Sequence, residues 1–142
     1  MESILHKEYT VVQNDYTNAG KVSSDIKTTL NEIGISPKII RKVAVASYEC
    51  EINQIIHAYG GKVYLDVSED GRIVLVFKDP GPGIPDINAA LTPGWSTASE
   101  QARGMGFGAG MGLPNIQRVS DEFDIQSSKE GTTVTIGFKA QL

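Results

Sequence analysis

The feature that most constrains this chain is a run of five alternating glycines from Gly104 to Gly112, which leads into a stretch of helical character beginning at Leu113. Backbone without side chains bends sharply and lets a ligand approach closely. Where such backbone enters a helix, free N–H groups and the positive end of the helix dipole converge. The run therefore predicts a cradle for an anion such as phosphate, although a flexible loop has the same composition.

Two familiar phosphate motifs are absent from this run. No Gly-x-Gly-x-x-Gly register fits, because the third glycine positions hold Ala109, Met111 and Leu113. The chain also lacks a Gly-Lys-Ser/Thr sequence. A dinucleotide fingerprint and a P-loop are therefore both excluded.

Length and charge narrow the class of protein further. The 142 residues fit one domain, 1–142, and the net charge of −4 without a basic cluster argues against a nucleic-acid partner. The single cysteine excludes an internal disulfide. The first eight residues do not resemble a signal peptide, and the longest apolar stretch, 73–77, is too short to span a membrane. We therefore expect a cytoplasmic protein.

Hydrophobic periodicity and turn residues predict an α+β fold. Gly34 stands where a helix would end, and Ser36-Pro37 stands where the next would begin. Between residues 79 and 112 regular structure is expected to be sparse. The fold class that follows is a two-layer sandwich, in which a mixed, mostly antiparallel sheet is covered on one face by helices. The expected strands are 4–12, 62–67, 72–78, 122–128 and 132–139, and the expected helices are 22–33, 37–58 and 113–120.

A carboxylate and an amide share one face of the second predicted helix. Glu49 and Asn53 are four residues apart and so stack one turn above the other. A carboxylate on a mostly buried helix is costly unless a metal ion or a catalytic cleft compensates it. A helix face that reaches solvent, or a local hydrogen bond, is the simpler explanation. His57 would extend the row to a metal site, whereas Glu51 points to the opposite side and is the weaker candidate.

Rigid turn sequences follow the third predicted strand. Residues 79–86 read Asp-Pro-Gly-Pro-Gly-Ile-Pro-Asp, a tight chain with exposed backbone amides. An aspartate at the end of a strand, such as Asp79, is well placed to accept a hydrogen bond from an exocyclic amino group. Taken as a bare pattern, the segment is compatible with any turn.

Four segments together resemble the motifs of the GHKL (Bergerat-fold) ATPase and kinase superfamily. They are Glu49-x-x-x-Asn53, Asp79-x-Gly-x-Gly83, Gly104–Gly112 and Gly131-Thr-Thr133, in that order and at similar spacing. The chain looks like the branch of anti-sigma factor serine/threonine kinases of bacterial partner-switching systems. Residues 110–123, GMGLPNIQRVSDEF, are especially similar to the stressosome-linked switch kinases of that branch.

The resemblance implies a role for each matching residue. Glu49 would be the general base, Asn53 the Mg²⁺ ligand, and Asp79 the residue that binds the adenine amino group of ATP. Gly83 would let the base lie close, and Thr132 or Thr133 would support it. The glycine run here is longer than the short pair typical of the branch. Further contacts to the nucleotide are implied for Gly81, Ile84, Ser96, Thr97, Arg103, Gly104, Gly106, Gly108, Gly110, Met111, Gly112 and Leu113.

The function implied is transfer of the γ-phosphate of Mg-ATP to a Ser or Thr of a STAS-type anti-sigma factor antagonist. The alternative is an ATP-gated binding module that sequesters a sigma factor or activates a phosphatase with little turnover. A histidine kinase is disfavoured, because His6 and His57 are the only histidines and neither lies in a dimerising helical hairpin. Homodimers occur in some branches of the superfamily, so the oligomeric state stays open.

Overall fold

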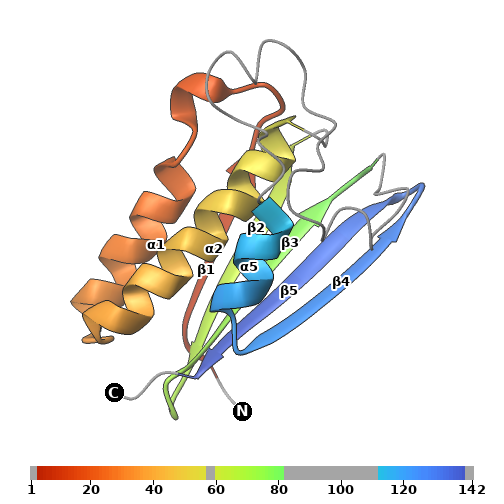
Figure 1. Ribbon diagram of the computed structural model, residues 1–142. Helices are drawn as coiled ribbons and strands as arrows, with labels where there is room; N and C mark the ends of the chain where they lie inside the picture. The colour runs from red at the N-terminus through yellow and green to blue at the C-terminus, as the bar shows by residue number, and fades with distance from the viewer. Residues whose placement is uncertain (1–2, 57–59, 82–111, 140–142) are drawn as a thin grey trace.

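The computed structural model describes residues 3–56, 60–81 and 112–139, and these form two layers, one of strands and one of helices (Figure 1). In the described ranges the strands are β1 (Ser3–Val11), β2 (Gly61–Ser68), β3 (Arg72–Asp79), β4 (Glu122–Ser128) and β5 (Gly131–Lys139). The helices there are α1 (Lys21–Glu32), α2 (Pro37–Ile56) and α5 (Gly112–Val119), with a short 3-10 turn, η1, at Tyr16–Asn18.

The five strands form one sheet in the order β1-β2-β3-β5-β4, and every pair of neighbours is antiparallel. The expected mixed sheet is therefore wholly antiparallel in these strands. Two hairpins, β2–β3 and β4–β5, are joined edge to edge through β3 and β5. This pairing sets Asp79 opposite Thr132.

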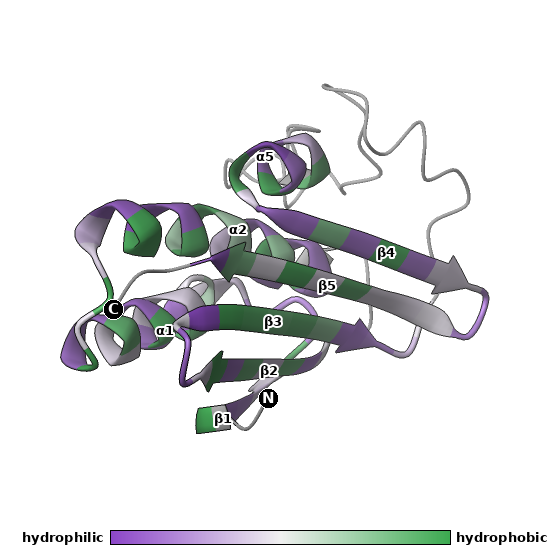
Figure 2. Cartoon of the chain, turned by 90° about the horizontal axis from the view of Figure 1, so that it is seen from below, coloured by the Kyte–Doolittle hydropathy of each residue, from purple (hydrophilic) through white to green (hydrophobic). Residues whose placement is uncertain are grey.

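The three α-helices of the described ranges lie on one face of the sheet (Figure 2), and the core fills the space between the two layers. Strand residues that point toward the helices alternate with residues that point away, as the period of two requires. The predicted fold class is confirmed. On the three central strands, the buried apolar side chains that point inward are Val63, Leu65, Val67, Ile73, Leu75, Phe77, Val134, Ile136 and Phe138.

Local sequence explains where α1 ends and α2 begins. Gly34 has a φ of 87° and donates its N–H to the carbonyl of Asn31, while Ile35 donates to Leu30. This is a Schellman motif, and it requires the left-handed conformation that glycine adopts freely. The hydroxyl of Ser36 then accepts the N–H of Ile39, so Ser36 is the N-cap of α2. Both predicted boundaries are confirmed.

The middle helix, α2, is less completely buried than its apolar composition indicates. Val45 and Tyr48 keep 38% and 37% of their surface exposed, and Arg41 one turn earlier is also exposed. These residues form the outer line of α2. On either side of this outer line, α2 packs against α1 and α5. A polar side chain next to the outer line is therefore half-buried and can still reach solvent.

Candidate active site

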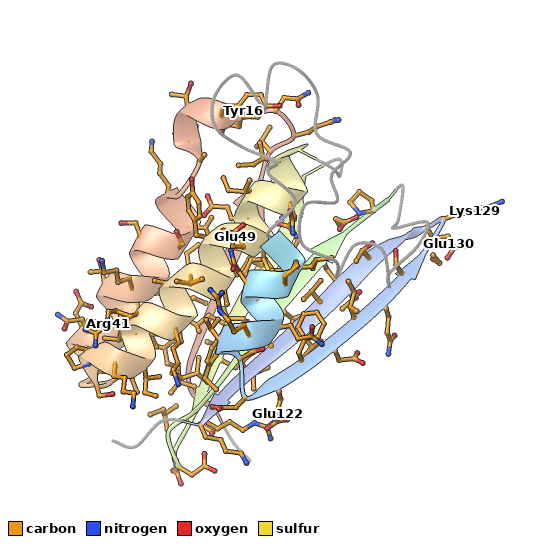
Figure 3. The ribbon with its side chains drawn as sticks, viewed as in Figure 1. Tyr16, Arg41, Glu49, Glu122, Lys129 and Glu130 are labelled. Atoms are coloured by element: carbon orange, nitrogen blue, oxygen red, sulfur yellow. The ribbon has the colours of Figure 1, made fainter. Side chains whose placement is uncertain are left out.

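The carboxylate of Glu49 lies where α2 meets α5 (Figure 3). Glu49 is half-buried, and the side chain of Asn115 on α5 hydrogen-bonds to it. Burial raises the pKa of the Glu49 carboxyl above its usual range, and the bond to Asn115 acts in the opposite direction. The site therefore holds an acid whose charge is costly and whose partner in the described part of the chain is Asn115. That is the condition expected of a general base.

One turn after Glu49, the half-buried Asn53 continues the same helical row. A carboxylate and an amide oxygen are hard donors, and Mg²⁺ is usually bound by one or two protein oxygens together with phosphate oxygens and waters. Among the residues that the structure describes, no group of three His, Cys, Asp or Glu side chains could hold a metal ion. The side chain of Asn53 offers an oxygen of the kind that Mg²⁺ takes from a protein when phosphates and waters supply the rest of its coordination sphere.

Asp79 forms the opposite end of the site, at the end of β3. It follows Ile73, Leu75 and Phe77 on the helix-facing side of the sheet. Its Oδ1 accepts the N–H of Gly81 at 3.0 Å, and the N–H of Thr132 also donates to the carboxylate. Burial raises the pKa of the Asp79 carboxyl, and these two hydrogen bonds oppose the shift.

The two candidate threonines lie on opposite faces of β5. Thr132 is buried on the helix-facing side, directly across from Asp79, and its Oγ1 lies 2.7 Å from the hydroxyl oxygen of Ser127. Thr133 is half-buried and points to the other face of the sheet. The structure therefore brings Thr132 to Asp79, and not Thr133.

Close backbone packing explains two glycines near Asp79. A Cβ on Gly131 would lie 2.0 Å from the carbonyl oxygen of Asp79, at a φ of 148°. Gly81, with a φ of 130°, would bring a Cβ to 3.3 Å from the carbonyl oxygen of Lys129. Any larger residue at position 131 would push the start of β5 away from Asp79. These glycines therefore shape the site in addition to any contact with a ligand.

Gln54, which the sequence reasoning missed, connects α2 to the sheet. It lies next to the candidate residue Asn53 and contacts the residue before the candidate Asp79. Its Nε2 donates to the carbonyl oxygens of Lys62 at 3.3 Å and Lys78 at 3.2 Å. Gln54 follows Asn53, and Lys78 precedes Asp79, so this bridge fixes α2 relative to the end of β3. The one sequence signal for this role of Gln54 is a polar residue placed among the apolar residues of α2.

Of the remaining predicted nucleotide contacts, Gly112 and Leu113 lie in the described residues. Gly112 is the first residue of α5, and Leu113 beside it is buried in the core. His57 and the other predicted positions lie outside the described residues. Those positions are Gly83, Ile84, Ser96, Thr97, Arg103, Gly104, Gly106, Gly108, Gly110 and Met111.

Glu51, the weaker acidic candidate, has a structural role on the other side of α2. It is 2% exposed and accepts the N–H groups of Gly20 at 3.0 Å, Ser23 at 3.1 Å and Val22 at 3.4 Å. The N-cap of α1 is Gly20, which has no side chain with which to cap the helix. Glu51 supplies the missing acceptor from a neighbouring helix, and its charge faces the positive end of the α1 dipole.

Replacing Glu51 with alanine is expected to destabilise the fold by roughly 3 kcal/mol, because three N–H groups at the start of α1 lose their acceptor. Urea unfolding followed by circular dichroism measures this change. Glu32→Ala is the matched control, since Glu32 is an exposed glutamate at the end of α1. A loss no larger than that of the control would show that Glu51 does not cap α1.

No helix in the described ranges is long and apolar enough to cross a membrane.

Comparison with known proteins identifies a family for almost the whole chain. A family model described as "Histidine kinase-like ATPase domain" matches residues 12–138. The serine/threonine-protein kinase RsbT of Bacillus subtilis (strain 168) is 30% identical over 112 residues, which cover 76% of this chain and 78% of that protein. The anti-sigma F factor of Heyndrickxia coagulans is 35% identical over 92 residues, 61% of this chain and 59% of that protein.

A solved structure shows the same fold. The crystal structure of the RsbU and RsbW domains of Rv1364c from Mycobacterium tuberculosis superposes with a TM-score of 0.64 at 19% identity. The match covers 94% of this chain and 32% of that longer chain. At this identity the likeness concerns the fold alone.

Proposed function

Because the chain belongs to the histidine kinase-like ATPase domain family, we propose that it is an Mg-ATP-dependent protein serine/threonine kinase of a bacterial partner-switching system. The observation that carries the proposal is the half-buried Glu49, held by Asn115 one turn before Asn53. A domain that only bound nucleotide would not need a desolvated carboxylate at this position. The similarity to a protein named as a serine/threonine kinase supports the same conclusion.

The nucleotide is proposed to lie between the two ends of the site. Asp79 accepts the hydrogen bond of the adenine amino group, and Thr132 supports the base from the neighbouring strand. Asn53 contributes an oxygen to Mg²⁺. The remaining phosphate contacts are proposed for Gly112 and the predicted glycines that precede it.

Bound Mg-ATP supplies a γ-phosphoryl group whose negative charge the metal ion offsets. The chain's own residues then position the groups and exclude water. Glu49 takes the proton of the acceptor hydroxyl while that oxygen bonds to the γ-phosphorus and the bond to ADP breaks. The proton ends on Glu49 and the phosphoryl group on the Ser or Thr oxygen, so atoms and charge balance.

The acceptor is proposed to be a STAS-type antagonist protein. The test is to incubate the chain with Mg²⁺ and γ-labelled ATP together with each STAS protein of the same genome. Stable label on a serine or threonine of one of them is the expected result. Failure of the wild-type chain to label any of these proteins would overturn the proposed substrate.

A second candidate function is an ATP-gated binding module, favoured by the similarity to proteins named anti-sigma F factors. In that case the chain would sequester a sigma factor or activate a phosphatase. The same experiment separates the two functions when complexes are followed by size-exclusion chromatography. A complex that requires ATP, without label on any partner, would favour the binding module.

A further inference from the structure

We propose that Asn115 on α5 is a positioning residue for phosphoryl transfer, because its side chain holds the carboxylate of Glu49 in the orientation that accepts the acceptor proton. The inference rests on the proposed function and gives a role to a residue to which the sequence analysis assigned none. The two residues are more than sixty positions apart in the sequence, and the helices that carry them pack directly against each other.

The position of Asn115 is fixed by the core on either side of it. Leu113 is 8% exposed and Ile116 is fully buried, so the first turn of α5 is anchored between α2 and the sheet. Asn115 lies between these anchors, half-buried, with its side chain on Glu49. Because the helix cannot rotate without exposing Ile116, the amide of Asn115 is held in place relative to α2.

An ionised carboxylate in a half-buried position needs a donor. The side-chain amide of asparagine has two N–H groups, and a carboxylate has two oxygens that accept. The hydrogen bond to Asn115 therefore restricts rotation of the Glu49 carboxyl, and the carboxylate keeps further acceptor capacity for a proton. A misplaced base costs rate even when substrate binding is unchanged.

The same helix also connects the base to the predicted phosphate site. Gly112, for which a phosphate contact is predicted, is the first residue of α5, and Asn115 follows three positions later. One short helix, α5, therefore carries both the residue that contacts Glu49 and a residue for which a phosphate contact is predicted.

The decisive experiment combines substitutions at both residues. Asn115→Ala is expected to lower the rate of transfer at saturating Mg-ATP by about 10-fold or more, with the Kd for Mg-ATP within a few fold of wild type. In the Glu49→Gln background, Asn115→Ala should have little further effect, because the residue acts through Glu49. Asn115→Gln keeps the amide donor and should recover part of the rate. The matched control is Gln117→Ala, an exposed position of the same helix.

A second readout requires neither nucleotide nor protein substrate. In the ¹⁵N-labelled chain, the side-chain amide resonances of Asn115 should shift on Glu49→Ala and stay unchanged on Gln117→Ala. Wild-type rates in Asn115→Ala, or an equal loss with and without Glu49, would overturn the positioning role and leave the kinase proposal intact. Absence of transfer by the wild-type chain would instead overturn the kinase proposal, and the role of Asn115 with it.

Discussion

Glu49→Gln is expected to lower phosphoryl transfer to the protein substrate by roughly 10²-fold or more, while the affinity for Mg-ATP changes by no more than a few fold. Glutamine keeps the shape of the side chain and an oxygen that can accept from Asn115, but it cannot take the acceptor proton. Single-turnover transfer from γ-labelled ATP measures the rate, and calorimetry measures the affinity. Equal losses in both would indicate a structural glutamate instead of a base.

The stability of the same variant provides the control. Burial raises the pKa of Glu49, so the folded state holds a proton more tightly than the unfolded state does. The protonated Glu49 therefore contributes to the free energy of unfolding at pH values below its ordinary pKa. This contribution is lost as the pH rises through the raised pKa. At neutral pH the neutral glutamine should therefore be no less stable than wild type. A clear drop in melting temperature would mean that lost folding, and not lost chemistry, explains a slow variant.

Local sequence predicts most of the elements because their boundaries depend on nearby residues. The Schellman turn at Gly34 and the cap at Ser36 each use hydrogen bonds within a few positions. The β2–β3 hairpin turns at Gly71, where φ is 84°. Such signals act within one turn of chain, so a single sequence reveals them.

The order of the strands depends on contacts that local patterns do not encode. The pairing of β3 with β5 joins segments separated by the whole stretch from 80 to 130. This register decides that Thr132, and not Thr133, shares a face with Asp79. The sequence left both threonines open because each is a β-branched residue in a strand with alternating burial.

The sequence indicates candidate site residues where they share one helix. It does not indicate those that are recognised by a contact with another element. Glu49 and Asn53 follow from a spacing of four. Asn115 and Gln54 are recognised only from their partners on other elements, because each is a single amide beside an apolar stripe. For Glu51 the sequence predicted the helix face, opposite Asn53. It did not predict the partners of Glu51 at the start of α1.

Asn53→Ala is expected to abolish Mg-dependent binding of ATP and, with it, phosphoryl transfer. The alanine removes the amide oxygen proposed to coordinate the metal ion, and Mg²⁺ in such sites has few protein ligands to replace it. Titration of ATP into the chain by calorimetry, with Mg²⁺ and with excess chelator, measures the effect. The wild-type chain should show a large difference between the two conditions, and the variant almost none.

Asn53→Asp distinguishes a metal ligand from a packing residue. A carboxylate oxygen still binds a hard cation, so this variant should retain much of the Mg²⁺ dependence that alanine loses. A residue that only packs against α5 would behave in the opposite way, because burying a second charge four positions after Glu49 costs more than truncation does. Normal phosphorylation by Asn53→Ala would remove the metal assignment. The fold and the role of Asp79 would remain, because the sheet pairing that supports them does not involve Asn53.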